Sequence, residues 1–128
     1  MNNRVNISHV NNMHNQWARS LNFFKTEIAI LRGLLTEIAG KNTDPELLKT
    51  IEHFENQFTI QNNNIDHILH RIHANIEALA KAVRDSSAGY VDGQLLEVHS
   101  QLGTDTVAEE KVMMELIHSF REFAARWL

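Results

Sequence analysis

Histidines are the residues of this chain whose type and spacing could support chemistry. There are eight among 128 residues, and His70, His73 and Glu77 stand at i, i+3 and i+7, so they share one face of a helix. Two imidazoles and a carboxylate match the ligands that zinc, iron or manganese accept in the cores of helical bundles. Completed by His14 or His99 from a neighbouring helix, these residues predict a metal site that holds Zn or Fe/Mn.

The same residues also have a purely structural interpretation. His70 and Glu77 lie one step outside the apolar seam of their segment, which is typical of a solvent-exposed flank. His14 and His99 occupy seam positions, where a histidine can be hydrogen-bonded to its neighbours in the core. A third hypothesis is a pH-responsive bundle, because protonation of all eight imidazoles near pH 6 would move the formal net charge from −4 to +4.

A second group of acidic residues and one histidine falls near the other end of the predicted helices. Glu115 and His118 have the Glu-x-x-His spacing of di-iron carboxylate bundles, but this motif occurs once, so a complete site would need a dimer or a fourth helix. The alternative is a set of surface carboxylates in which Glu55 pairs with Arg121. The whole group is Glu27, Glu55, Glu115, His118 and Glu122.

Motifs of known enzymes are missing from the sequence. It contains no glycine-rich phosphate loop, no Gly-x-Ser-x-Gly elbow and no His-Glu-x-x-His. We therefore predict no catalytic residues, no cofactor-binding residues and a function that is not enzymatic.

The elements that position these side chains are three long helices. In the first, apolar residues recur in steps of three and four with His14 as the one exception, which predicts a helix over residues 7–39 that stops at Gly40. Asp44 followed by Pro45 is a start signal for a second helix of about 40 residues. The seam of the first helix is Ile7, Val10, His14, Trp17, Leu21, Phe24, Ile28, Leu31, Leu35 and Ile38.

The third segment begins near Asp92, after the break at residues 86–89, and runs to the C-terminal end. Short connections make consecutive helices antiparallel, so we predict one all-α domain over residues 1–128, an up-down-up bundle of three long helices. A break near Gly103 would give a four-helix bundle instead. Polar seam residues, Glu55, Asn62 and Glu109, are expected to fix the register between helices.

Composition limits the partners. A net charge of −4 and a pI near 6.0, with scattered basic residues, argue against nucleic acid, and the lack of a long apolar run argues against a membrane. Zero cysteines suit a cytoplasmic location. Phe23, Ile30 and Ile60 lie away from the seams, so we expect a homodimer.

Two segments, residues 17–27 and 52–58, resemble segments of small, uncharacterised all-helical bacterial proteins. The resemblance covers most of the chain and implies a helical bundle with no assigned activity. Together these observations favour a helical-bundle protein that acts by self-association or by binding a partner helix.

Overall fold

The chain is all-α, as the sequence predicts. The computed structural model describes residues 7–85 and 93–128, which form three helices, α1 (Ile7–Lys41), α2 (Pro45–Asp85) and α3 (Gly93–Trp127), and no strand occurs in these ranges. Helix α3 continues through Gly103 without a break, so the four-helix alternative is wrong. The predicted break at residues 86–89 and the predicted start at Asp92 lie outside the described residues.

The connection between α1 and α2 shows both a confirmed and a corrected boundary. The Asp44 carboxylate accepts a hydrogen bond from the Glu46 backbone N–H at 3.0 Å, as expected of an N-cap residue ahead of a proline. Helix α1 ends at Lys41 rather than Ala39. Because the Asn42 side-chain amide donates to the Ile38 carbonyl at 2.9 Å, a capping amide serves this helix end and Gly40 remains helical.

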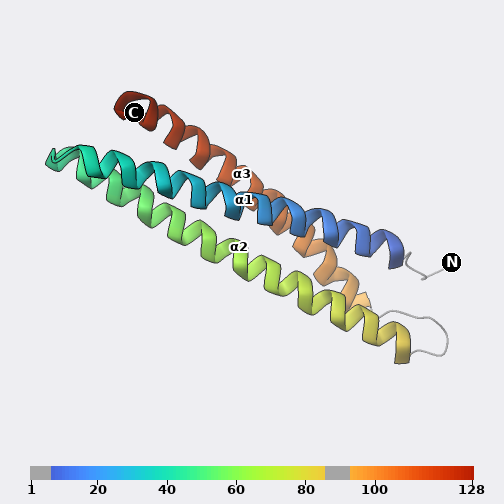
Figure 1. Ribbon diagram of the computed structural model, residues 1–128. Coiled ribbons are helices and arrows are strands. Elements are labelled where there is room, and N and C mark those ends of the chain that lie inside the picture. The colour runs from blue at the N-terminus through green and yellow to red at the C-terminus, as the bar shows by residue number, and fades with distance from the viewer. Residues whose placement is uncertain (1–6, 86–92) are drawn as a thin grey trace.

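The three helices pack side by side along their length. In Figure 1 the chain runs out along α1, returns beside it along α2 and runs out again along α3. Contacts between side chains of α1 and α2 follow the same arrangement, because the residue number on α2 decreases as that on α1 increases. The three pairs are His14 with Asn75, Lys25 with Asp66, and Arg32 with Glu55. In residues 7–85 and 93–128, no helix is long and apolar enough to cross a membrane.

The core has an aromatic part and a polar part. The rings of Phe54, Phe58 and Phe120 are buried. Phe120 packs edge to face against both Phe54, at 5.3 Å between centroids, and Phe58, whereas Phe54 and Phe58 are stacked. The polar residues buried elsewhere in the core are His14, Gln61, Asn75, Thr106 and Glu109. Burial of Glu109 agrees with its predicted place in the seam of the third helix.

The buried face of α2 differs from the predicted seam. We expected Glu55 and Asn62 to point into the core, but Phe54 and Gln61 are buried there, Glu55 is exposed and Asn62 is half-buried. Helix α2 packs against both α1 and α3, so its buried face is wider than a single seam. A shift of one residue turns a helix by about 100°, which is enough to exchange a core position for a flank.

Candidate functional site

A hydrogen-bonded layer of three side chains links all three helices at one end of the core. His14 of α1 is fully buried, and its Nε2 lies 2.9 Å from Oδ1 of Asn75 on α2. The same nitrogen lies 3.2 Å from Nδ1 of His99 on α3. One atom of His14 therefore meets both neighbouring helices.

The position of each proton in this layer follows from a single backbone contact. The Asn75 Nδ2 donates to the Leu95 carbonyl at 3.1 Å, which fixes the amide with Oδ1 towards His14. Because Oδ1 can only accept, neutral His14 must carry its proton on Nε2. That N–H also faces Nδ1 of His99, so neutral His99 carries its proton on Nε2.

Burial favours the neutral form of both imidazoles. Burial lowers the pKa of His14, the nearby His99 lowers it further, and the hydrogen bond with Asn75 opposes these effects. Burial also lowers the pKa of His99, and His9 adds to the effect. The Nδ1 atom of His14 is buried and has no hydrogen-bond partner among the described residues. In neutral His14 this nitrogen carries no proton, and an acceptor without a partner costs little. Protonation of Nδ1 would create a buried donor without a partner, which is costly.

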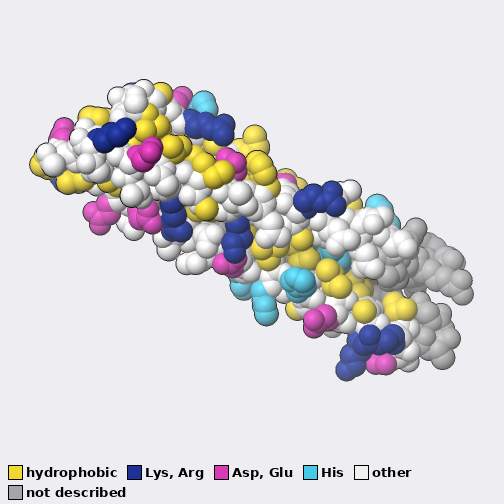
Figure 2. Space-filling model, viewed as in Figure 1, with side chains coloured by type: hydrophobic (Ala, Val, Ile, Leu, Met, Phe, Trp, Pro, Cys, Tyr) yellow, Lys and Arg dark blue, Asp and Glu magenta, His cyan; other side chains and the backbone are white. Residues whose placement is uncertain are grey.

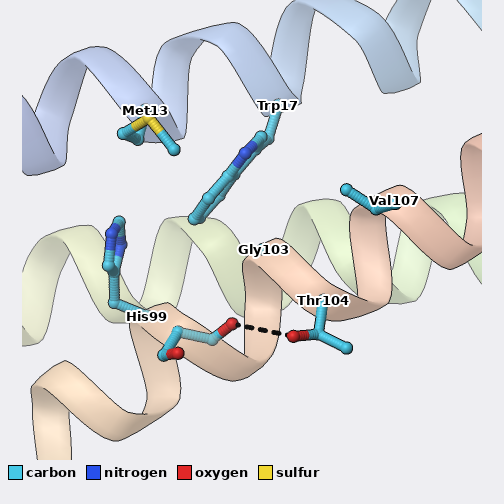
Figure 3. Close-up of a pocket in the computed structure, with 7 residues that line it drawn as sticks. Met13, Trp17, His99, Gly103, Thr104 and Val107 are labelled. Carbon is cyan, nitrogen blue, oxygen red and sulfur yellow. Dashed lines mark hydrogen bonds between the residues drawn. The ribbon is translucent and has the colours of Figure 1, made fainter.

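An open cavity of about 570 Å³ adjoins this layer between α1 and α3. It is lined by Met13, Trp17, His99, Ser100, Gly103, Thr104 and Val107. Figure 3 shows Met13 and Trp17 extending from α1 towards α3, from which the His99 ring rises. The Trp17 ring lies 4.9 Å from the His99 ring and 5.5 Å from the His14 ring, measured between centroids, so one wall of the cavity is continuous with the buried layer.

A buried carboxyl group forms a second polar contact in the core. Burial raises the pKa of Glu109 to about 7. With the Gln61 amide turned so that Nε2 faces Glu109, Gln61 donates to the two carboxylate oxygens at 2.7 and 3.1 Å. With the amide turned the other way, a protonated Glu109 would donate to Gln61 Oε1 instead, so the pair can be satisfied in either protonation state.

The structure brings together two of the five predicted metal ligands. His14 and His99 are in contact, whereas His70, His73 and Glu77 are exposed on α2. In the described part of the chain no three His, Asp or Glu side chains gather closely enough to hold a metal ion, so the five do not form one group. The reason is register: the α2 residue that points inward at this level is Asn75, which is buried.

The second predicted group is divided among surface ion pairs. Glu55 pairs with Arg32 at 3.1 Å, and Arg121 pairs with Glu27 at 3.6 Å, so the predicted Glu55–Arg121 pair is wrong. His118 contacts Glu122 at 2.9 Å one turn further along α3, and both side chains are exposed. Glu115 is also exposed.

Sequence reasoning missed Asn75 and Gln61, the two α2 partners of the buried polar groups. A signal was present, because Phe54, Gln61, Ile68 and Asn75 recur at seven-residue intervals and therefore share a face. The predicted seam of α2 agrees with the buried face at alternate positions, such as Phe58 and Ile65, but places Glu55 and Asn62 where Phe54 and Gln61 are buried. Comparisons of the chain with protein-family models, with curated proteins and with solved structures found no match.

Proposed function

We propose that this chain is a non-enzymatic, up-down-up helical bundle that acts by self-association through an apolar face of α1 and α3. The observation that carries the proposal is the exposure of three large apolar side chains. Phe23 is 57% exposed, Ile30 is 53% exposed and Met114 is 65% exposed. We refer to these three residues as the apolar face.

The three residues belong to one surface. Phe23 and Ile30 are seven residues apart on α1, so they lie on the same side of that helix. Phe23 and Met114 both line a cavity of about 340 Å³, at the edge of which Arg121 pairs with Glu27. Figure 2 shows hydrophobic side chains reaching the molecular surface at several places along the bundle. An apolar centre with a charged edge is the usual composition of an interface.

The expected association is weak. If two copies pair the same face about a two-fold axis, six apolar side chains lose their remaining exposure, and each contributes on the order of 1 to 2 kcal/mol. Association costs on the order of 4 kcal/mol or more. These magnitudes favour a dimer that forms at micromolar or higher concentration.

Size-exclusion chromatography with light scattering, between about 5 and 500 µM protein, tests this proposal. Met114→Asp should keep the chain monomeric over the whole range, because a dimer would bury the new charge. Val112→Asp is the matched control: Val112 is also exposed on α3, at 40%, but two residues away, on another side of the helix. A strictly monomeric wild type, or equal effects of both substitutions, would overturn the proposal.

Metal binding is a second candidate function, favoured by one distance. His14 Nε2 and His99 Nδ1 lie 3.2 Å apart, close to the ~3.3 Å between two ligand atoms of a tetrahedral zinc site. Against it, a metal-bound histidine normally donates its other N–H to an acceptor, and Nδ1 of His14 has no partner in the described part of the chain. Elemental analysis of untagged protein, with melting temperatures in added zinc, iron or manganese, tests it: substoichiometric metal and unchanged melting would exclude this function.

A further inference from the structure

The cavity between Met13, Trp17, His99 and Val107 has the size and lining of a small-molecule site. Its volume of about 570 Å³ falls within the range of roughly 300 to 1,000 Å³ that is usual for ligand pockets. The seven described residues that line it include no Lys, Arg, Asp or Glu. Such a lining disfavours phosphate-bearing ligands, which need basic groups, and favours an apolar molecule.

A glycine in the middle of α3 shapes this cavity. A Cβ atom at Gly103 would lie 2.8 Å from Cζ2 of Trp17, so the indole rests directly against the α3 backbone. Glycine inside a helix costs up to about 1 kcal/mol relative to alanine. That cost has a local explanation here, because only glycine lets the indole lie in this position.

His99 gives the largely apolar cavity a hydrogen-bond donor whose proton position follows from the buried layer; the hydroxyl groups of Ser100 and Thr104 also line the cavity, and that of Thr104 donates to the Ser100 carbonyl. The contact between Asn75 and Leu95 fixes the proton of His14 on Nε2, and that proton fixes the proton of neutral His99 on its own Nε2. His99 lines the cavity, so its Nε2–H is the group that the imidazole offers to a ligand. Largely apolar walls with an oriented imidazole donor favour a ligand ring that bears a hydrogen-bond acceptor.

We propose that this cavity binds a small aromatic molecule that carries one hydrogen-bond acceptor. The rings contact Met13, Trp17 and Val107, and the acceptor receives the hydrogen bond from His99. Indole and thioether groups make favourable contacts with aromatic rings. The site uses none of the three residues of the apolar face, but Val107 lies on the same side of α3 as Met114, seven residues earlier, so the experiment must separate ligand binding from self-association.

The probe for the test is 6-propionyl-2-(dimethylamino)naphthalene, an uncharged dye with a naphthalene ring and one ketone acceptor. The chain has two tryptophans, so Trp127→Phe leaves Trp17 as the one donor for energy transfer to the bound dye. We expect one dye molecule per chain, bound at micromolar concentration and close enough to quench Trp17. No binding up to 1 mM, or binding without quenching of Trp17, would overturn the proposal.

Two substitutions in this background locate the site. Val107 is 63% exposed, so Val107→Phe should fill the mouth of the cavity without disturbing the core and weaken dye binding at least tenfold. The control, Val112→Phe, should change the affinity for the dye less than twofold. His99→Phe removes the donor and should weaken binding at least fivefold. Equal affinities for Val107→Phe and Val112→Phe would refute the site, and unchanged affinity for His99→Phe would refute the role of the acceptor.

Met114→Asp separates this inference from the proposed function. The substitution should abolish dimerisation and leave quenching of Trp17 by the dye unchanged. If dye binding were lost together with the dimer, the dye would be reporting the apolar face and the cavity proposal would be wrong. A monomeric wild type that still binds one dye at Trp17 would refute self-association alone.

Discussion

Replacement of Glu109 by glutamine should make the stability of this bundle less dependent on pH. Burial raises the pKa of Glu109 from 4.5 to about 7, whereas the unfolded chain ionises this group near its ordinary value. The folded state therefore binds one more proton than the unfolded state between these values, so stability falls as pH rises through that window and levels off above pH 7.

The magnitude follows from the width of the window. A difference of 2.5 pH units between the two pKa values, at about 1.4 kcal/mol per unit, gives an upper limit of about 3.5 kcal/mol. Hydrogen bonds from Gln61 to the ionised carboxylate, at 2.7 and 3.1 Å, reduce this cost. Glu109→Gln has the same shape, needs no proton and can exchange a hydrogen bond with Gln61 in either amide orientation. We expect its stability advantage over the wild type to grow by about 2 kcal/mol between pH 5 and pH 8.

Urea unfolding followed by circular dichroism at 222 nm measures this difference, with the free energy extrapolated to water. Glu115→Gln is the matched control, because it makes the same chemical change at an exposed position of the same helix. The control should differ from the wild type by less than about 0.5 kcal/mol at both pH values. An advantage of Glu109→Gln that is equal at pH 5 and pH 8 would refute the burial argument.

Two further predictions concern the histidine layer and the cavity. In the Glu109→Gln background, the stability of the fold should decrease as the pH drops below 6.5. The reason is that the pKa values of His14 and His99 are lowered in the folded state, while histidines of the unfolded chain protonate near pH 6.5. Urea unfolding at pH 7.5 and pH 5.5 measures this loss, and a gain in stability on acidification would contradict the prediction. Gly103→Ala should destabilise the fold by about 1 to 2 kcal/mol in thermal unfolding, because the new methyl group meets Trp17 at 2.8 Å. Gly33→Ala is the control: a Cβ atom there has no atom within 4 Å, so this substitution should stabilise the fold by up to about 1 kcal/mol. Stabilisation by both substitutions would show that the indole moves aside freely.

Most of the fold could be predicted from the sequence because it depends on local rules. The apolar register of α1, the Asp44–Pro45 start signal and the unbroken register through Gly103 each act within one or two helical turns, and the structure confirms them. Exposure of Phe23 and Ile30 follows from the same periodicity. These predictions needed no knowledge of how one helix is placed against another.

The partners across the helices could not be predicted, because they depend on axial register and on rotation of each helix. The predicted metal site brings His73 of α2 together with His14, but the α2 residue that points inward at this level is Asn75, two positions later. Two residues correspond to about 3 Å along the helix and to about 200° around it. The displacement along the helix axis is small, but the rotation about the axis exchanges a buried side chain for an exposed one. The same sensitivity explains the wrong pairing of Glu55 with Arg121.

Several departures from the rules of a simple helical bundle coincide at one level of the molecule. His14 is a buried imidazole at an apolar position, Gly103 is a poor helix former inside α3, and Val107 is an apolar residue left exposed beside them. The first two departures reduce stability relative to an ordinary choice at those positions. A role in fixing the register between helices explains the buried His14. That role does not explain why the indole of Trp17 rests on the α3 backbone at Gly103, or why an open cavity lies beside it. Because departures that gather in this way are expected at functional sites, the end of the bundle that contains Trp17 is the part in which a ligand should be sought first.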